Sequence, residues 1–244
     1  MIENILPSQV VVVETREDLP EAMLFPEEEA VIAQAVDKRR LEFRTVRHCA
    51  RRAMSTLGLP PAPLLPGERG APRWPDRTVG SMTHCAGYRA AAVGRTDEVR
   101  TIGIDAEPHA PLPDGVLDAV SLPGERARHA RLVRTDPAVR WDRLLFSAKE
   151  SVYKAWFPLT GRWLDFEDAD ITFQAGTSAF EARLLVPGHT AGGADLTGFT
   201  GRWLVEGGLV FTAITVLSAA RAPVLREENA ETALPVAPGT PATP

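Results

Sequence analysis

The most constraining feature of the sequence is one long amphipathic helix pattern that is followed only by short strand-like runs. Apolar residues recur at helical spacing in this segment: Trp141, Leu145, Ala148, Val152 and Trp156. The pattern predicts a helix that begins at Asp136-Pro137, an N-cap followed by proline, and ends at Pro158. The downstream runs predict strands at 171–173, 180–186, 201–205 and 210–217.

The first half of the chain also combines helix and strand. Residues 26–57 carry a helical period that ends at Gly58 and a proline cluster, and strands are predicted at 10–13, 89–93 and 99–104. The segment up to Val79 is too rich in glycine and proline for a regular element, and such long loops are usually functional. No internal repeat is legible. Both halves mix the two element types, so the predicted class is α+β.

Charge and composition exclude several classes of protein. The 244 residues include 32 Asp plus Glu against 27 Lys plus Arg, a net charge of −5, which disfavours a nucleic-acid or anionic-membrane binder. The N-terminus has no basic region and its apolar run is broken by Pro7 and Glu14, so no signal peptide is predicted. Two cysteines fit no disulfide framework, and we expect a cytoplasmic protein. Residues 222–244, rich in proline and alanine, predict a disordered tail.

Two acidic residues end the strand predicted at 99–104. Strand alternation places Ile102 and Ile104 on one face, and Asp105 and Glu107 on the other. Two neighbouring carboxylates can both reach a hard divalent cation such as Mg²⁺. The alternative is a solvated strand end without a ligand.

A third acidic residue, Glu150, lies in the long helix between Lys149 and Lys154. Glu150 and Lys154 are four residues apart, which also suits an ordinary intrahelical ion pair. In the functional interpretation Glu150 completes the carboxylate set as ligand or base, and the lysines supply positive charge for phosphate oxygens.

Positive charge is concentrated in residues 38–52. Four arginines follow helical spacing and form one stripe: Arg40, Arg44, Arg47 and Arg51. Glu42 is the only acid among seven Lys or Arg, so a bound anion would relieve their repulsion, although an exposed basic face is the commoner use of such a pattern. The charge is local and lacks interleaved aromatic residues, which favours a small phosphorylated ligand over nucleic acid.

The segment 79–88 contains small residues, hydroxyl groups and His84, and we expect a turn there that approaches phosphate closely. GAPRWP at 70–75, GSMTH at 80–84, IGIDAE at 102–107 and FSAKESVYK at 146–154 resemble, in this order, the motifs of the Sfp-type 4′-phosphopantetheinyl transferases. Longer stretches are similar to the actinobacterial branch of that family: TVRHCAR at 45–51, GSMTHCAGYRAAAVG at 80–94, IGIDAEPH at 102–109 and AKESVYKAWFPLT at 148–160. The resemblance covers the chain from Arg39 to about Trp163.

The resemblance implies a fold of two similar α+β halves related by a pseudo-twofold in one monomer, with coenzyme A in the cleft between them. The halves would span residues 1–118 and 119–221, followed by the tail at 222–244. The implied reaction uses Mg²⁺, or Mn²⁺ in its place, to hold the pyrophosphate of coenzyme A. A serine of an apo acyl or peptidyl carrier protein of polyketide, nonribosomal peptide or fatty acid synthases attacks the β-phosphorus, and 3′,5′-ADP leaves.

By position, the resemblance also implies roles for individual residues. Asp105, Glu107 and Glu150 would bind the metal, Glu150 would be the base, directly or through water, and the catalytic Lys154 would neutralise the pyrophosphate with Lys149. Coenzyme A would be bound as well by the remaining residues that match: Arg39, Arg47, Thr83 and His84.

Two departures from the family pattern concern the cleft. Pro66 stands where close relatives can carry a lysine, which leaves Arg69 as the nearest cation, and Ala106 cannot bind metal through its side chain. Two other functions use the same residues: a different Mg²⁺-dependent phosphotransferase or phosphohydrolase acting on a nucleotide-like molecule, and a non-catalytic coenzyme A-binding module. Carrier-dependent product formation separates the first from a transferase, and the second has no use for three acids around a metal.

Overall fold

The computed structural model describes residues 1–190 and 193–218. Its strands form two antiparallel sheets. The smaller sheet has the order β1-β3-β2: β1 (Val11–Thr15), β3 (Tyr88–Arg95) and β2 (Thr78–Cys85). The larger sheet has the order β4-β8-β7-β6-β5: β4 (Val99–Pro108), β8 (Leu209–Leu217), β7 (Asp195–Glu206), β6 (Ala179–His189) and β5 (Ala169–Gln174). The α+β class predicted from the sequence is confirmed.

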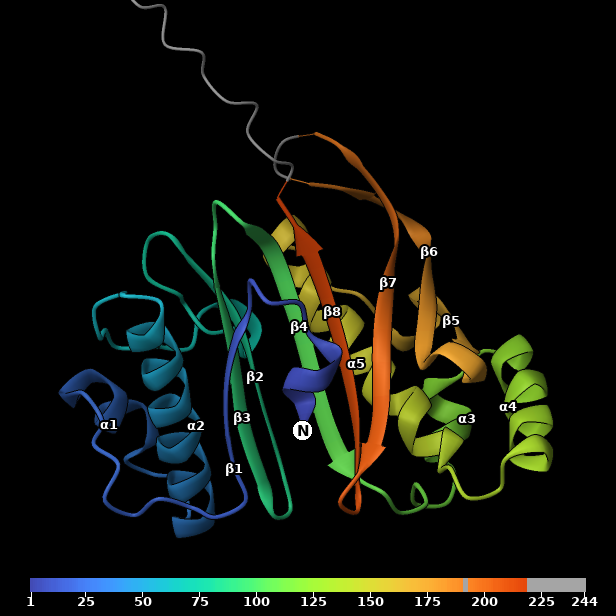
Figure 1. Cartoon of the computed structure of the whole chain (residues 1–244), viewed down its shortest axis with the longest axis horizontal. Coiled ribbons are helices and arrows are strands. Elements are labelled where there is room, and N and C mark those ends of the chain that lie inside the picture. The colour runs from blue at the N-terminus through green and yellow to red at the C-terminus, as the bar shows by residue number, and fades with distance from the viewer. Residues whose placement is uncertain (191–192, 219–244) are drawn as a thin grey trace, which may run out of the picture.

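Helices flank the row of strands. The helices are α1 (Pro26–Ile32), α2 (Asp37–Thr56), α3 (Val116–Val120), α4 (Pro123–Thr135) and α5 (Trp141–Thr160). Short 3-10 turns are η1 (Ile2–Ile5), η2 (Glu68–Gly70), η3 (Phe166–Asp168) and η4 (Ala175–Thr177). The strands run side by side through the middle of the molecule, with α1 and α2 at one end of the row and α4 at the other (Figure 1). The helix α2 packs on β1 and β3, and α5 packs on β4 and β8.

The two sheets meet where β2 lies beside β4. No backbone ladder joins these strands, since each belongs to a different sheet. The Ile104 N–H instead donates to Ser81 Oγ at 3.1 Å, and the Ala106 N–H donates to Thr83 Oγ1 at 3.2 Å. Side-chain hydroxyls of β2 therefore satisfy two backbone amides on the outer edge of β4.

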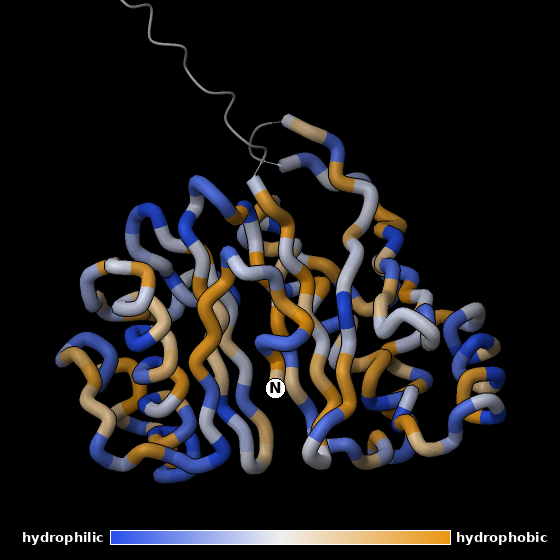
Figure 2. Tube along the Cα trace, viewed as in Figure 1, coloured by the Kyte–Doolittle hydropathy of each residue, from blue (hydrophilic) through white to orange (hydrophobic). Residues whose placement is uncertain are grey.

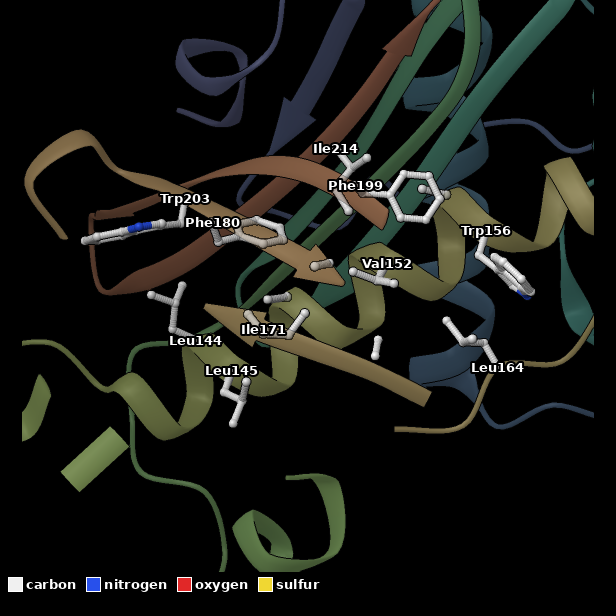
Figure 3. Close-up of a cluster of buried hydrophobic side chains, with 14 of the residues drawn as sticks. Leu144, Leu145, Val152, Trp156, Leu164, Ile171, Phe180, Phe199, Trp203 and Ile214 are labelled. Atoms are coloured by element: carbon white, nitrogen blue, oxygen red, sulfur yellow. The ribbon is translucent and has the colours of Figure 1, made fainter. Parts of the chain in front are cut away.

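The largest core cluster lies between α5 and the larger sheet. Figure 3 shows labelled side chains of α5 and of four strands in this space: Leu144, Val152 and Trp156 from the helix, and Ile171, Phe180, Phe199 and Ile214 from the strands. Long hydrophobic stretches follow the central strands in Figure 2. The apolar periodicity that predicted the helix thus describes its buried face.

A glycine of β4 brings α5 unusually close to the strand. A Cβ atom at Gly103 would lie 2.0 Å from the Ser151 backbone oxygen and 2.8 Å from the Ala155 backbone nitrogen. Any other residue would push the helix away, because such distances are far inside van der Waals contact. The acidic end of β4 consequently faces the middle of α5, where Glu150 and Lys154 lie.

Four local predictions were wrong. The helix predicted over 26–57 is divided into α1 and α2, and residues 78–85 form strand β2 where we expected a turn. Only glycine fits at position 80 of that strand, because a Cβ atom there would lie 2.6 Å from the Trp74 ring. The helix α5 begins at Trp141 rather than Asp136, which instead follows the unpredicted helix α4.

The end of α5 also differs from its prediction. Pro158 lies inside the last turn, and the helix continues to Thr160 before Gly161 ends it with a φ of +64°. Proline is tolerated in this position because only one helical hydrogen bond is lost near the end. The left-handed conformation of Gly161 is the usual helix stop.

A buried glutamate fixes the start of α1. Glu28 accepts a hydrogen bond from the Phe25 N–H at 3.0 Å, as a capping box requires. It also pairs with Arg51 of α2 at 2.9 Å and accepts the Leu64 N–H at 2.8 Å. One fully buried carboxylate thus joins α1, α2 and the loop after α2.

The second half of the chain contains the same device at the start of α4. Glu125 accepts the Leu122 N–H at 2.7 Å, pairs with Lys149 of α5 at 2.9 Å and accepts the Ile171 N–H at 2.7 Å. Both glutamates lie two residues after a proline, at Pro26 and Pro123. This repeated contact pattern supports the predicted likeness of the two halves, whose pseudo-twofold relation stays a prediction.

Among the described helices, none is long and apolar enough to cross a membrane. The predicted disordered tail at 222–244 lies outside the described residues. The predicted boundary at residue 118 assigns β4 to the first half. This strand is hydrogen-bonded to β8 of the second half, so one sheet contains strands of both halves.

Candidate active site

A cleft of about 530 Å³ separates residues of the two halves. The first half contributes side chains of α2, the loop after it and β2, and the second half contributes α5. The charged and polar residues on its wall include Arg39, Arg47, Arg69, His84, Glu150, Tyr153 and Lys154. Cations and an acid therefore line one continuous space.

Asp105 lies buried where β4 faces α5. Its Oδ1 accepts hydrogen bonds from Lys154 Nζ at 2.7 Å and from Thr83 Oγ1 at 3.1 Å. Its Oδ2 is buried and has no hydrogen-bond partner among the described residues. A buried carboxylate oxygen without a donor is energetically unfavourable unless a cation or another group meets it.

Glu107 lies on the same face of β4, as the strand alternation predicted. Its Oε2 pairs with Arg143 Nη1 of α5 at 3.0 Å. Burial raises the pKa of Glu107, Asp105 raises it further, and Arg143 acts in the opposite direction. The two neighbouring carboxylates therefore repel each other, which a divalent cation between them would relieve.

Glu150 lines the cleft on α5. Burial raises the pKa of Glu150, and this effect exceeds the opposing attraction of Lys154. Lys154 itself donates to Asp105 and to the Ile104 carbonyl, and no ion pair between Lys154 and Glu150 occurs in the described part of the chain. The alternative interpretation, an intrahelical ion pair, is therefore not what the structure contains.

Asp105, Glu107 and Glu150 supply the oxygen ligands that a hard cation prefers, but their side chains do not converge on one point in this structure. Within residues 1–190 and 193–218 no three acidic, histidine or cysteine side chains stand close enough to hold a metal ion. Asp105 and Glu107 are paired with Lys154 and Arg143 instead. Asp105 Oδ2 is buried without a hydrogen-bond partner among the described residues, and this favours a cation because Mg²⁺ prefers such oxygen ligands.

A cationic cluster forms another part of the cleft wall. Arg39 Nη1 lies 2.6 Å from His84 Nε2, and Glu42 Oε2 lies 3.7 Å from His84 Nδ1. Burial lowers the pKa of His84, and Arg39 lowers it further. The imidazole is therefore poised to gain a proton when an anion offsets the charge of Arg39.

Arg47 is buried beside this cluster. Its Nε donates to the Leu64 carbonyl at 2.9 Å, and its guanidinium lies 3.1 Å from the centre of the Phe43 ring. Burial lowers the pKa of Arg47 to about 10, and Glu28 partly offsets this. Its two terminal nitrogens donate no hydrogen bond to any described residue, so both can bind an anion in the cleft.

Two further arginines of the stripe have partners inside the protein. Arg51 pairs with Glu28, while Arg44 donates to the Pro20 carbonyl and lies 3.3 Å from Glu29. The expectation that these charges need a bound anion was thus too broad, because acids outside the helix neutralise part of the stripe.

Lys149 does not match its implied role. Its Nζ donates to Glu125 and, at 2.6 Å each, to the carbonyls of Phe166 and Ala169. These three acceptors use all three donors of the ammonium group. The side chain is 1% exposed, so it cannot reach pyrophosphate without breaking a buried ion pair.

Thr83 also lies away from the cleft wall. It is buried, and its hydroxyl contacts Asp105 and the Ala106 amide. A direct contact with coenzyme A, which the family resemblance implied, has no support in this arrangement. Ala106 is buried and packs in the hydrophobic core.

Two residues of the candidate site, Arg143 and Tyr153, were not predicted from the sequence. Arg143 lies seven residues before Glu150, two helical turns along the same face of α5, and this spacing was the available signal. Tyr153 lines both the cleft and a second cavity, and its hydroxyl is buried without a partner in the described chain.

The second cavity, of about 270 Å³, adjoins the cleft at Arg69, Glu150 and Tyr153. Trp163, Leu164 and Phe166 make much of its wall apolar.

The loop after α2 contributes one cation to both spaces. Arg69 lines the cleft and the second cavity, and its guanidinium lies 5.1 Å from the centre of the Trp163 ring. Arg69 has a φ of +53°, an uncommon conformation for a residue with a side chain. An isolated antiparallel β-bridge between Pro66 and Pro72 closes the turn that contains Arg69.

Comparison with known proteins confirms the family resemblance predicted from the sequence. A model of the 4′-phosphopantetheinyl transferase N-terminal domain matches residues 27–94, and a model of the 4′-phosphopantetheinyl transferase superfamily matches residues 101–191. The chain belongs to the 4′-phosphopantetheinyl transferase superfamily. The two matches cover the elements that carry the cationic cluster and the carboxylates.

Two relatives are similar over nearly their whole length, and a third over about three quarters of its length. The 4′-phosphopantetheinyl transferase Svp of Streptomyces mobaraensis is 56% identical over 95% of this chain and 94% of its own. The 4′-phosphopantetheinyl transferase PptT of Mycobacterium tuberculosis is 56% identical over 88% of this chain and 98% of its own. The enterobactin synthase component D of Salmonella typhi is 30% identical over 74% of each chain.

Proposed function

We propose that this protein transfers the 4′-phosphopantetheine group of coenzyme A to a serine of apo acyl or peptidyl carrier proteins and releases 3′,5′-ADP. The acceptors would be carrier proteins of polyketide, nonribosomal peptide or fatty acid synthases. The observation that carries the proposal is one cleft lined by the cationic cluster, Glu150 and Lys154, with Asp105 of β4 paired to Lys154, in a chain of this superfamily.

Coenzyme A would span the cleft from the cationic cluster to α5. Arg39, Arg47 and His84 would bind its 3′-phosphate, since a phosphate accepts several charge-assisted hydrogen bonds at once. The apolar second cavity beyond Glu150 suits the pantetheine arm, and the unpartnered Tyr153 hydroxyl could donate to one of its amide carbonyls.

Asp105, Glu107 and Glu150 would hold Mg²⁺, with Mn²⁺ as a possible substitute. When bound, the metal would neutralise the charge of the pyrophosphate. Lys154 lies beside Asp105 and would add positive charge near the same oxygens. The pairs of Asp105 with Lys154 and of Glu107 with Arg143 would have to loosen when the metal enters.

Glu150 would be the general base, directly or through water. Burial raises its pKa toward the range in which a carboxylate accepts protons effectively. In the transfer, the serine oxygen bonds to the β-phosphorus, the bond between that phosphorus and the bridging oxygen breaks, and the serine proton goes to Glu150. The leaving group is 3′,5′-ADP, so atoms and charge balance without another reactant.

We further propose a monomer in the cytoplasm, where Cys49 and Cys85 would remain thiols, as they are in the structure. The substrate partners are coenzyme A and carrier proteins, with no role for nucleic acid or membrane.

The test is the release of 3′,5′-ADP from coenzyme A, measured with and without an apo carrier protein. A transferase releases 3′,5′-ADP only when the acceptor serine is present. Release at the same rate without carrier would identify a phosphohydrolase, and no release in either case would identify a binding module. A carrier with its serine replaced by alanine is the matched control.

A further inference from the structure

The seam between β2 and β4 contains two hydroxyls that are alike in one contact and different in another. Ser81 Oγ accepts the Ile104 N–H, and Thr83 Oγ1 accepts the Ala106 N–H. Thr83 alone of these two makes a further bond, to Asp105 Oδ1 at 3.1 Å. Replacing Ser81 therefore removes only a contact between the sheets, whereas replacing Thr83 also removes a hydrogen bond to Asp105.

The direction of the hydrogen bonds at Thr83 is fixed by chemistry. A backbone N–H can only donate, so Thr83 Oγ1 is the acceptor from Ala106. The single hydroxyl hydrogen is then free to donate to the carboxylate of Asp105, which only accepts when ionised. The amide of Ala106 thereby holds the hydroxyl in the orientation that Asp105 requires.

The two oxygens of Asp105 have different surroundings. Oδ1 receives both Thr83 and Lys154, whereas Oδ2 is buried with no hydrogen-bond partner among the described residues. The donors that fill Oδ1 leave Oδ2 as the oxygen with unused lone pairs. A hydroxyl orients the carboxylate without cancelling its charge, which Lys154 does cancel in part.

We propose that Thr83 is a positioning residue that fixes the Asp105 side chain so that Oδ2 is presented to the metal ion. The inference rests on the proposed function, and it replaces the direct contact with coenzyme A that the resemblance implied for Thr83. Partners of this kind, which bind a metal ligand rather than the metal, commonly change metal affinity by about 10- to 100-fold.

The experiment measures Mn²⁺ binding by electron paramagnetic resonance of the free ion, in full-length protein with coenzyme A and without a carrier protein. Thr83→Val keeps the shape and removes the hydroxyl, Thr83→Ser keeps the hydroxyl, and Ser81→Ala removes the other seam hydroxyl. Thr83→Val should weaken Mn²⁺ binding about tenfold or more, and Thr83→Ser should stay within about threefold of wild type.

Ser81→Ala is the matched control for the seam itself. It should lower the thermal unfolding midpoint about as much as Thr83→Val, because each variant leaves one buried amide of β4 without its acceptor. It should leave Mn²⁺ affinity within about twofold of wild type, because it does not touch Asp105. In steady-state turnover, excess Mg²⁺ should restore most of the kcat of Thr83→Val, while the KM for coenzyme A stays close to wild type.

Equal Mn²⁺ affinity in Thr83→Val and wild type, or equal weakening in Thr83→Val and Ser81→Ala, would overturn the positioning role. Failure of wild type to bind Mn²⁺ would overturn it too. Carrier modification by wild type is assayed in parallel. It separates failure of the positioning role of Thr83 from failure of the proposed function, because the transfer can be intact while the role of Thr83 is wrong.

Discussion

Lys154 Nζ lies 2.7 Å from Asp105 Oδ1, across from α5 to β4, and does not pair with Glu150 one turn earlier on its own helix. The cross-element contact is possible because Gly103 lets α5 rest directly on β4. Glu150 is consequently left with a half-buried carboxylate that pairs with no lysine among the described residues. The structure thus contains Lys154 paired with Asp105 rather than with Glu150, and the role of Glu150 as the base stays a proposal.

Glu150→Gln should therefore abolish most of the turnover while the protein stays folded. The substitution preserves the shape but removes both the negative charge and the proton acceptor, and loss of a general base alone costs about 10²- to 10⁴-fold. Single-turnover transfer to an apo carrier protein measures the chemical step. A variant that kept its kcat would show that another group accepts the serine proton.

Arg47→Ala should weaken the binding of coenzyme A more than it slows the chemical step. A charge-assisted contact with phosphate is worth about 1.5–3 kcal/mol, so kcat/KM should fall about tenfold to a hundredfold. Wild type should prefer coenzyme A over 3′-dephospho-coenzyme A, and the preference should shrink in the variant. Undiminished discrimination by Arg47→Ala would mean that this residue does not contact the 3′-phosphate.

Acid should strengthen coenzyme A binding through His84. Burial and Arg39 hold the pKa of His84 below its ordinary value of 6.5 in the free protein. A bound phosphate favours the protonated ring and raises that pKa, so binding takes up a proton, and affinity rises as pH falls through the interval between the two values.

Calorimetry of coenzyme A binding across this range checks the effect, with His84→Gln as control. The phosphate monoester titrates near pH 6 as well, but it does so identically in both proteins. The expected result is that wild type gains affinity over His84→Gln as pH falls. Parallel curves would show that His84 takes no proton on binding.

Lys149→Met should affect stability rather than substrate binding. It leaves Glu125 buried without its cation, and breaking a buried ion pair from one side costs about 3–5 kcal/mol. Urea unfolding should show this loss, and the KM for coenzyme A of the folded protein should change by less than about threefold. A large rise in KM with unchanged stability would instead return Lys149 to the phosphate site.

Short-range patterns in the sequence predicted much of the fold. Apolar spacing found α5, and strand alternation placed Asp105 and Glu107 on one face, because both patterns follow from local geometry. The strand β2 escaped prediction since its small residues are explained only by contacts such as that of Trp74 with Gly80. The helix α4 escaped as well, because its face toward the core is weakly apolar and its only buried residue is Glu125.

The candidate site shows the same limit. The spacing of residues predicted which charged residues belong to the site, but not which residues they pair with. Lys149 and Lys154 lie on one helix, and only tertiary contacts show that one pairs with Glu125 and the other with Asp105. Glu28, Glu29 and Glu125 neutralise basic residues that lie far away in sequence. Pairing across elements depends on the packed structure, and no single-sequence pattern reports it.

Transfer of phosphopantetheine to a carrier serine can be tested by the intact mass of an apo carrier protein after incubation with the enzyme, coenzyme A and Mg²⁺. We expect a gain of one phosphopantetheinyl group on the serine, and no gain in excess chelator or on a carrier with alanine in place of that serine. An unchanged carrier mass under complete conditions, with folded enzyme and carrier, would contradict the proposed transfer.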